Sequence, residues 1–300
     1  MSSSSNDLLA DRRFAWAQAM MDEGDPVAAA DLFGQVVERV PAWAPGWAAL
    51  AEARERGGDT AGARTAWTQV LSLDPEARLG AVPHLARLDG RTPAALPAGY
   101  LRALFDDYAP RFDRHLVEAL HYRGPATIVE ALDRTVPVRR FRRALDLGCG
   151  TGLMGRALQL RVERIDGVDL SPAMIEQARS TGLYADLTAG PLEVALLESD
   201  ADVHDLVVAA DVLIYLGDLA PVFAGAARAM AAGGVLAFTV QTIAVGAGFV
   251  LGPDMRFGHA PDHVNDALVS AGLRPLLFEP RSIRCEKGLA VPGLVVVAAR

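Results

Sequence analysis

The stretch ALDLGCGTG, residues 144–152, is the clearest indication of how this chain folds. A short apolar run that includes one acid, Asp146, leads directly into glycines at every second position, Gly148, Gly150 and Gly152. Glycine has no Cβ, so it lets a turn tighten and lets a ligand lie against the backbone. The segment that follows, LMGRALQL, has helical spacing. We therefore expect a strand, a ligand-binding loop and a helix in succession.

The carboxyl-terminal two thirds of the chain alternate between apolar strands and amphipathic helices. The expected strands are 143–147, 164–169, 183–186, 204–210, 234–240, 274–279 and 291–299, and the expected helices lie near 152–161, 172–181, 191–198, 219–231 and 262–271. This alternation predicts an α/β, Rossmann-like fold whose seven-stranded, mostly parallel sheet has helices on both faces. No helix separates the last two strands, so we expect an antiparallel C-terminal hairpin at the sheet edge.

The glycine spacing distinguishes two kinds of nucleotide site. Dinucleotide-binding proteins carry G-x-G-x-x-G, whereas this chain has G-x-G-x-G preceded by Asp146. The second strand ends at Asp169, 17 residues after Gly152, and Ser171 in DLSPAMIEQAR stands where it would cap the next helix. These segments resemble motif I and the second motif of the class I S-adenosylmethionine (SAM) methyltransferases.

Later segments resemble the same family in order. LYADL places Asp186 after the third expected strand, HDLVVAADVLIYLGDL resembles the fourth motif, and ARAMAAGGVLAFTV resembles the helix and Gly-Gly turn before strand five. The resemblance covers about residues 100–300. It implies an enzyme that transfers a methyl group from SAM to an acceptor.

The resemblance also implies a set of cofactor contacts. The methionyl end of SAM would lie over the glycine loop, Asp169 would accept hydrogen bonds from both ribose hydroxyls, and Asp186 would accept one from the adenine amino group beside Leu187. Asp146 would either face the SAM ammonium or be a buried acid satisfied by loop amides, and Cys149 is interpreted as a small loop residue. The implied cofactor-binding residues are Asp146, Gly148, Cys149, Gly150, Gly152, Asp169, Leu170, Asp186, Leu187 and Ala209.

The acceptor site is less defined, because methyl transfer mainly needs alignment, and a base helps only where the acceptor loses a proton. Residues 105–116 resemble the aromatic helix that lies over SAM in small-molecule members, so Tyr108 and Phe112 are expected to roof the site. The insertion 241–264 brings Arg256 and His259 toward the strand carboxyl ends. His259 is the candidate base and Tyr108 the second candidate catalytic residue.

The fourth motif favours a small-molecule acceptor. Residues 210–213 read Ala-Asp-Val-Leu, where DNA-base and glutamine N-methylating members carry (Asn/Asp)-Pro-Pro-aromatic. Arg281 and Arg284 in the final hairpin would bind an acidic acceptor or be solvated. Whether oxygen, nitrogen, carbon or sulfur is methylated stays open.

The first 90 residues contain a repeat with a period of 34. The resemblance is to the tetratricopeptide (TPR) repeat, with helices expected near 8–23, 26–39, 44–57 and 60–72 and a closing helix over 75–88. Such arrays bind peptides in a concave groove or brace a neighbouring domain, and both roles stay open. The expected domains are 1–90 (TPR-like), 91–99 (linker) and 100–300 (methyltransferase). The repeated positions are Gly24, Asp25, Ala29, Phe33, Val36 and Pro41, matched by Gly58, Asp59, Ala63, Trp67, Val70 and Pro75.

Composition narrows the function classes. The net charge is −8 without a basic face, so we expect no nucleic-acid partner. No apolar run reaches the ~20 residues that span a bilayer, and the start has no signal-peptide pattern. With Cys149 and Cys285 as the only cysteines, we expect no metal site and a reducing, cytoplasmic location. Two rival classes remain: a SAM-binding protein without turnover, and a TPR interaction protein with a degenerate enzyme domain.

Overall fold

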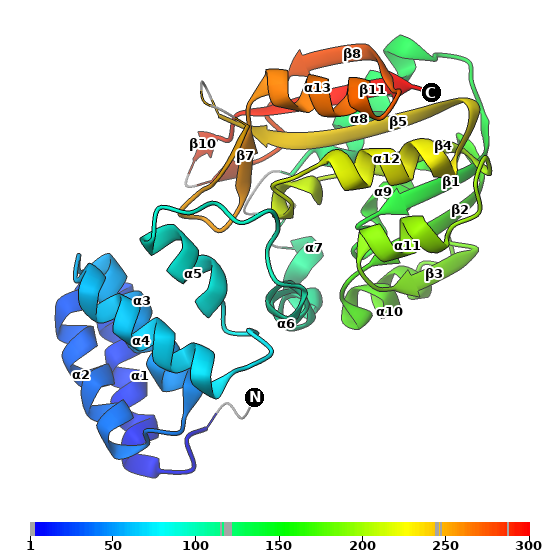
Figure 1. Cartoon of the computed structure of the whole chain (residues 1–300). Coiled ribbons are helices and arrows are strands. Elements are labelled where there is room, and N and C mark those ends of the chain that lie inside the picture. Colours follow the sequence, from blue (N-terminus) through cyan, green and yellow to red (C-terminus); the bar gives the residue numbers. More distant parts are fainter. Residues whose placement is uncertain (1–3, 115, 117–121, 244–245, 247, 287) are drawn as a thin grey trace. The chain divides into compact units, whose positions relative to one another are not determined.

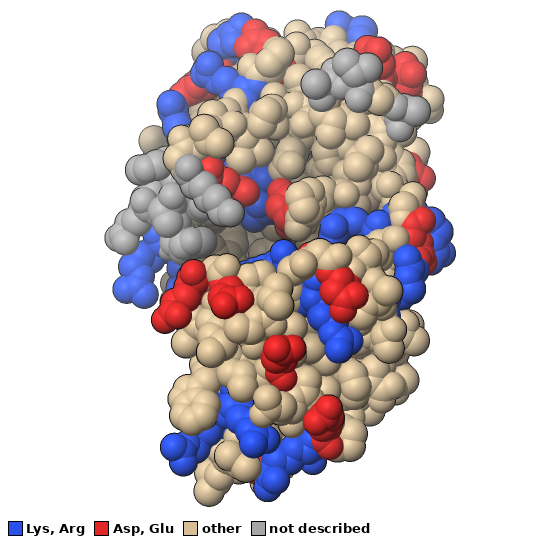
Figure 2. All heavy atoms as spheres, turned by 90° about the vertical axis from the view of Figure 1, so that its left-hand side faces the viewer, with Lys and Arg blue, Asp and Glu red and all other residues tan. Residues whose placement is uncertain are grey.

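The computed structural model describes residues 4–300 except 115, 117–121, 244–245, 247 and 287 (Figure 1). The chain divides into two compact units, Met1–Arg91 and Thr92–Arg300. No helix in the part of the chain that is described has both the length and the apolar character needed to cross a membrane. On the face drawn in Figure 2, basic and acidic side chains are interspersed over the described surface.

The first unit is all-helical. Helix α1 packs against α2, and α3 packs against α4. Phe33, Leu50 and Trp67 fill the space between the helices and are almost fully buried. The first four helices lie within two residues of their expected bounds. The helices of this unit are α1 (Leu8–Glu23), α2 (Pro26–Arg39), α3 (Ala44–Arg56), α4 (Thr60–Leu73) and α5 (Ala81–Leu88).

The repeated Gly-Asp pair connects the helices. Gly24 and Gly58 adopt positive φ angles of 87° and 83°, which glycine reaches without steric cost. Asp25 and Asp59 then cap the next helix, because their carboxylates accept hydrogen bonds from backbone N–H groups three residues on, at 3.0 and 2.9 Å. The closing helix starts later than expected. The carboxylate of Asp74 accepts from the Leu79 N–H at 2.8 Å and stabilises a turn there.

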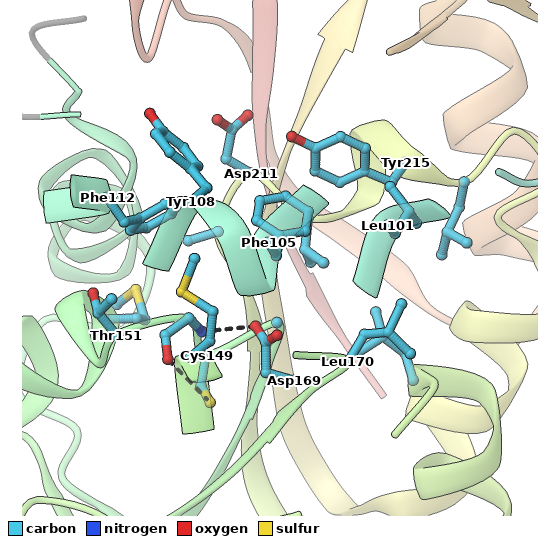
Figure 3. A pocket seen from close by; sticks show the side chains of 18 of the residues that line it. Leu101, Phe105, Tyr108, Phe112, Cys149, Thr151, Asp169, Leu170, Asp211 and Tyr215 are labelled. Carbon is cyan, nitrogen blue, oxygen red and sulfur yellow. Dashed lines mark hydrogen bonds between the residues drawn. The ribbon is translucent and has the colours of Figure 1, made fainter. Parts of the chain in front are cut away.

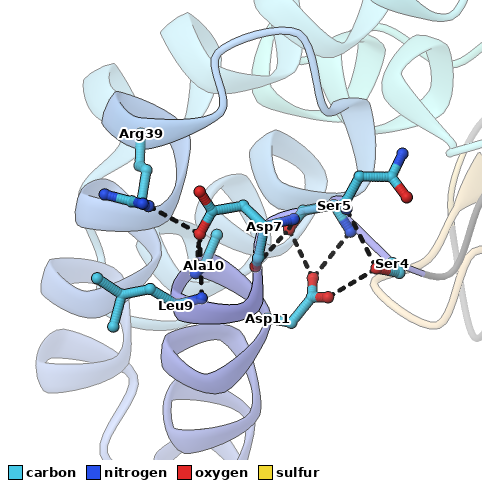
Figure 4. Close-up of polar contacts among 8 residues, drawn as sticks. Ser4, Ser5, Asp7, Leu9, Ala10, Asp11 and Arg39 are labelled. Carbon is cyan, nitrogen blue, oxygen red and sulfur yellow. Dashed lines mark hydrogen bonds and ion pairs between the residues drawn. The ribbon is translucent and has the colours of Figure 1, made fainter.

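The start of α1 is held by a similar polar cluster (Figure 4). The carboxylate of Asp7 accepts from the backbone N–H groups of Leu9 and Ala10 and is paired with Arg39 at 2.8 Å. These contacts hold the pKa of Asp7 at about 2, with the Arg39 hydrogen bond as the largest cause. Because Arg39 lies in α2, the cap also ties the two helices together.

The second unit is built on one sheet whose main path has seven strands in the order β3-β2-β1-β4-β5-β11-β8. Strand β11 is antiparallel to both neighbours, and β1 to β5 are parallel. The α/β fold with its antiparallel C-terminal hairpin is therefore confirmed. The strands of this path are β1 (Phe141–Leu147), β2 (Val162–Asp169), β3 (Asp186–Ala189), β4 (His204–Ala209), β5 (Met230–Thr242), β8 (Arg274–Pro280) and β11 (Gly293–Ala299).

Helices cover both faces of the sheet (Figure 1). Alternate residues of β4 show the two faces: Leu206 packs with one core, which includes α8 and α9, and Val207 packs with the other, which includes α11, α12 and α13. The helices are α8 (Gly124–Thr135), α9 (Leu153–Leu158), α10 (Pro172–Ser180), α11 (Leu192–Glu198), α12 (Ala220–Ala229) and α13 (Pro261–Ser270).

Two regions differ from the expected strands. Strand β3 begins at Asp186, where 183–186 was expected, because the Tyr184 side chain turns into the interior. The insertion after β5 contains two short strands, β6 (Phe249–Leu251) and β7 (Phe257–His259), and β7 continues the sheet beside the end of β5. The final hairpin also holds β9 (Cys285–Glu286) and β10 (Leu289–Ala290).

The segment before β1 is part of the second unit. Its helix α6 (Ala98–Tyr108) runs through a 3-10 turn, Ala109–Arg111, into α7 (Phe112–Arg114). Residue 115 of the expected aromatic segment 105–116, and residues 117–121 after it, lie outside the described residues. In the expected linker, the carbonyl of Ala94 accepts from the backbone N–H groups of Gly217 and Asp218, and Leu96 is buried.

Candidate active site

A cavity of about 240 Å³ opens at the carboxyl ends of β1, β2 and β4 (Figure 3). Parallel sheets bind ligands at this edge, since the loops that follow the strands converge there. The glycine loop and the ends of β2 and β4 form its floor, and α6 and α7 contribute aromatic side chains. The lining residues from the strand ends are Gly148, Cys149, Gly150, Thr151, Asp169, Leu170, Ala210, Asp211 and Val212.

The glycine loop needs its glycines. Gly148, Gly150 and Gly152 all have positive φ, at 69°, 52° and 95°, so a side chain at any of them would strain the backbone. A Cβ on Gly148 would also collide with Val212, whereas one on Gly150 would face Phe112 at 3.7 Å. The backbone of Gly150 therefore forms a surface that a ligand can approach closely.

Asp169 is fixed beside this loop. Its two carboxylate oxygens accept hydrogen bonds from the Gly150 N–H at 2.9 Å and the Ser171 N–H at 2.8 Å. Burial raises the pKa of Asp169, and the two amide hydrogen bonds oppose that shift. The carboxylate is thus held in one position at the end of β2, with Leu170 next to it on the cavity wall.

Asp146 lies beneath the loop, among the fully buried residues and away from the cavity lining. The Tyr184 hydroxyl donates to its Oδ2 at 2.6 Å, and its buried Oδ1 has no hydrogen-bond partner among the described residues. Burial raises the pKa of Asp146 to about 7. Of the two roles left open for Asp146, the geometry favours that of a buried acid. Its one hydrogen bond among the described residues comes from a side-chain hydroxyl, where hydrogen bonds from loop amides were expected.

Cys149 lies in the loop and is almost fully buried. Burial raises the pKa of its thiol, and the neighbouring Asp146 and Asp169 carboxylates raise it further. A thiol in such an environment stays protonated and is a poor nucleophile. This agrees with its interpretation as a small loop residue.

The aromatic segment expected over the site lines the cavity. Tyr108 and Phe112 pack edge to face with ring centroids 5.1 Å apart, and Phe105 packs against Tyr215 at 5.3 Å. The segment is anchored to the floor, because the Thr151 hydroxyl in the glycine loop donates a hydrogen bond to the carboxylate of Asp113. The rings therefore form one wall of the cavity, opposite the loop (Figure 3).

A charged cluster closes the end of the cavity nearest β4. Asp211 pairs with Arg284 at 2.6 Å, and the Arg284 side chain is almost fully buried. Arg256, from the insertion, also lines the cavity and forms an ion pair with Glu286. Arg281 lies elsewhere, in an exposed ion pair with Glu130. The sequence suggested four basic residues for the acceptor site: Arg256, His259, Arg281 and Arg284. The structure brings Arg256 and Arg284 to the cavity.

His259 was expected to reach the site as a base. That expectation is wrong, because the structure places His259 outside the cavity lining. Its imidazole is fully buried in β7, with Nε2 2.9 Å from the carbonyl oxygen of Leu216. Burial lowers the pKa of the ring. Periodicity alone did not reveal that the insertion forms a strand that takes this histidine into the sheet.

Besides Asp146, four cofactor candidates lie off the lining: Gly152, which precedes α9, and Asp186, Leu187 and Ala209. Asp186 opens β3, at the edge of the sheet away from the cavity, because the strand begins three residues later than expected; its carboxylate accepts from the Leu187 N–H at 2.9 Å. Leu187 packs near Cys149 in a small core. Ala209 packs in the core shared with α12, and the next three residues, 210–212, line the cavity. The residues after β3 that line the cavity are Pro191, Leu192 and Glu193.

Sequence reasoning missed several residues that shape the site. Tyr184 was expected in a strand, and Asp211 was expected at the carboxyl end of the fourth strand without a role of its own. The aromatic Tyr215 and Tyr122 also line the cavity. An acid at the first position after a buried strand was the available signal for Asp211, since such positions face the ligand-binding edge.

The lining fits S-adenosylmethionine. The bare backbone of the glycine loop leaves room for a ligand, a fixed carboxylate suits a pair of hydroxyl donors, and Leu170, Met174 and Leu192 offer apolar surface for a base. Among the described residues, no group of three acidic, histidine or cysteine side chains is placed to hold a metal ion.

Comparison with known proteins agrees with this site. Residues 145–236 match the family model described as "Methyltransferase domain". Human methyltransferase-like protein 27 is 37% identical over 108 residues, which cover 35% of this chain and 43% of that protein. The malonyl-[acyl-carrier protein] O-methyltransferase of Salmonella typhimurium is 31% identical over 144 residues, which cover 46% of this chain and 52% of that protein.

A third relative matches elsewhere in the chain. A TPR repeat-containing protein of Pseudomonas aeruginosa, PA0015, is 42% identical over 60 residues, which cover 20% of this chain and 57% of that protein. The chain spans about half the length of the curated relatives it matches.

Solved structures share the fold. The [4+2]-cyclase SpnF superposes with a TM-score of 0.57 at 17% identity and covers 70% of this chain and 98% of its own. A chain from the complex of the Haloferax volcanii Trm112 methyltransferase activator with a methyltransferase gives 0.52 at 21% identity, covering 66% and 96%. The match of residues 145–236 to a methyltransferase domain implies S-adenosylmethionine as the cofactor.

Proposed function

We propose that this protein transfers a methyl group from S-adenosylmethionine to a small-molecule acceptor. The observation that carries the proposal is the meeting of the glycine loop and Asp169 in one cavity that also holds an aromatic wall. The concave and mostly apolar lining of this cavity is typical of sites for small molecules.

In this proposal the chain binds the cofactor with few side chains. The loop backbone at Gly148, Cys149 and Gly150 accommodates the methionyl end, and Gly152 shapes the entry to α9. Asp169 accepts from the ribose hydroxyls, and Leu170 lies along the adenosine. When bound, the cofactor supplies an activated methyl group on a sulfonium. The residues around it orient the acceptor and exclude water.

Direct binding tests the cofactor assignment. Calorimetry with SAM, S-adenosylhomocysteine (SAH) and NAD is expected to give heat for the first two only. Asp169→Ala is expected to weaken SAH binding ~10- to 150-fold, since hydrogen bonds to a charged group contribute about 1.5–3 kcal/mol. Binding of NAD in place of SAH, or native affinity in the variant, would contradict the proposal.

The fold by itself leaves the reaction open, because the [4+2]-cyclase SpnF shares it. A protein that binds SAM without turnover is the alternative. Formation of SAH from SAM in the presence of an acceptor decides between them, and a panel of phenols, amines and carboxylic acids provides the acceptors.

We infer that the helical unit consists of two TPR-like repeats with a closing helix. The 34-residue period, the Gly-Asp caps and the likeness to PA0015 support this interpretation. A peptide partner in its groove and a bracing role remain the two candidates. Retention of SAM turnover without this unit would favour the partner role. We also propose a cytoplasmic location, from the scarcity of cysteine.

A further inference from the structure

The acid Asp211 occupies an unusual position at the carboxyl end of β4. Its φ is 57°, a left-handed conformation that is uncommon for residues other than glycine. The backbone is held there because its N–H donates to the Thr239 hydroxyl at 2.9 Å. One carboxylate oxygen, Oδ1, accepts from Arg284 at 2.6 Å. The side chain keeps 14% of its exposure and lines the cavity, so the carboxylate can meet a ligand.

The positive charges around Asp211 are all paired with carboxylates. Arg284 donates to Asp211, to Gln241 at 2.6 Å and to Glu286 at 2.9 Å. Arg256 forms an ion pair with the same Glu286 and a hydrogen bond to Tyr215. Arg256 also pairs with Asp254 at 3.7 Å, so two guanidinium groups face three carboxylates. Among the described residues at this end of the cavity, no positive charge is left over for an anionic ligand, so the site suits a neutral one.

Asp211 is the carboxylate best placed to take a proton. Three described lining residues carry carboxylates, Asp169, Glu193 and Asp211, and none of the described lining residues is a histidine. Both oxygens of Asp169 accept from loop amides. Glu193 follows β3, which is separated from β4 by β2 and β1 in the sheet. Among the described residues no backbone amide donates to Oδ2 of Asp211, and this side chain lines the cavity.

The walls next to Asp211 are aromatic. Figure 3 draws its carboxylate between the side chains of Tyr108 and Tyr215. Tyr215 packs edge to face on Phe105, and Phe112 does the same on Tyr108. Flat, apolar walls of this kind favour a planar ring, because aromatic pairs prefer edge-to-face and offset contacts.

We propose that Asp211 is the proton-accepting residue of an acceptor subsite that takes a neutral phenol. The inference rests on the proposed methyl transfer and names its substrate class. The ring would lie against the aromatic wall, and its hydroxyl would donate to Oδ2 of Asp211. Arg284 is the positioning residue that holds the other oxygen.

The proton balance follows from this arrangement. The phenolic O–H bond breaks and its proton passes to Oδ2 of Asp211, while an oxygen electron pair forms the new bond to the methyl carbon. The carbon–sulfur electron pair stays on sulfur. The products are an aryl methyl ether, SAH and a protonated Asp211, which then releases its proton to water. Burial raises the pKa of Asp211 to about 6, which brings it closer to that of a phenol, about 10.

A chromophoric phenol tests the subsite without turnover. The full chain is saturated with SAH and titrated with 4-nitrophenol, whose phenolate absorbs in the visible and whose neutral form does not. The ionised Asp211 should repel the phenolate, so the bound probe is expected to stay neutral to higher pH than the free probe. The other ionisable groups near Asp211 are Arg256, Arg284, Glu286, Tyr122 and Tyr215.

The variant Asp211→Asn is expected to reverse the preference of the subsite for the neutral phenol over the phenolate. Asparagine keeps the size and tolerates the left-handed backbone, but it removes the negative charge that would repel an anion, and the two arginines are then left with Glu286 and Asp254. We expect the phenolate form to bind at least 10-fold better than in the parent, and benzoate binding to appear. Asp107→Asn makes the same chemical change on an exposed side chain of α6 and is expected to behave as the parent.

The outcomes separate the two proposals. Preferential binding of phenolate or benzoate by the parent chain would overturn the assignment of Asp211, because it would show an anion site. Failure of 4-nitrophenol to bind to SAH-saturated protein would also overturn it and would leave the cofactor assignment intact. Failure of SAH itself to bind would refute the proposed function. Should Asp211→Asn unfold, the titration of the parent chain still decides.

Discussion

The Ser171 hydroxyl donates a 2.6 Å hydrogen bond to the carboxylate of Asp106 while it accepts one from the Met174 N–H at 3.1 Å. One fully buried side chain therefore caps α10 and holds α6. It stands two residues after Asp169, whose carboxylate accepts from its backbone N–H. The aromatic wall and the proposed ribose contact are thus joined through a single serine.

Asp106→Ala is expected to loosen this connection. The loss of a charge-assisted hydrogen bond, worth about 1.5–3 kcal/mol, should free α6 from α10. We expect faster hydrogen exchange across residues 98–114 and weaker SAH binding, by about 10-fold. Hydrogen exchange with and without SAH, together with calorimetry, measures both effects.

Asp107→Ala is the matched control for that prediction. Asp107 lies on the same helix, is exposed and forms an i,i+4 pair with Arg111, and such pairs contribute little. Equal effects of the two variants would mean that the change reflects helix propensity and that the contact with Ser171 is unimportant for binding.

Gly150→Val is expected to abolish SAH binding, since its side chain would project toward Phe112 and fill the space over the loop. The strain of a positive φ must be separated from this blockage. Gly182→Val provides the control, because Gly182 also has a positive φ, 67°, with nothing within 4 Å of its Cβ position. Both variants should lose similar stability, and only the first should lose affinity. Retained affinity in Gly150→Val would place the ligand elsewhere.

Local patterns were sufficient for the order of the elements. The strands with continuous apolar runs, such as β1 and β4, end within one residue of their expected carboxyl ends, because burial on both faces leaves a clear signal. The glycine spacing and Asp169 pointed to the correct edge of the sheet. These features depend on residues that are close in sequence.

Contacts between distant segments determine the two features that local patterns did not predict, the start of β3 and the position of His259. Tyr184 enters the interior because Gly155 and Gly167 leave room for its ring, and this shift moves β3 and takes Asp186 away from the cavity. His259 enters the sheet through a strand that pairs only with the end of β5 and with β6. Contacts between such distant segments leave no periodic trace, so neither was visible from local patterns.

A chain that starts at Thr92 is expected to fold and to bind SAH with native affinity. Every residue assigned to the cavity lies beyond this point. A chain that starts at Tyr100 should be less stable, because it loses the Ala94 hydrogen bonds to Gly217 and Asp218 and the buried Leu96. Thermal unfolding and calorimetry on both chains check this. Loss of SAH affinity in a folded chain that starts at Thr92 would show that the helical unit takes part in binding.

Asp146→Asn is expected to stabilise the second unit at high pH. The pKa of Asp146 is about 7 in the folded state against an ordinary 3.8, so the folded state retains a proton that the unfolded state releases. Stability from this group is therefore lost as pH rises from about 4 to 7. The variant should match the parent near pH 4.5 and exceed it near pH 8, by on the order of 4 kcal/mol. Urea unfolding followed by circular dichroism at both values measures the difference.

Tryptophan fluorescence separates the units in that experiment, because Trp16, Trp43, Trp47 and Trp67 all lie in the first unit. Its transition should not change with Asp146→Asn. Tyr184→Phe provides a second test, because it removes the hydroxyl that lowers the pKa of Asp146. In this variant, the loss of stability with rising pH should continue to a higher pH than in the parent. A stability gap that is the same at pH 4.5 and pH 8 would show that Asp146 is ionised throughout, and that a counter-charge or water reaches its Oδ1.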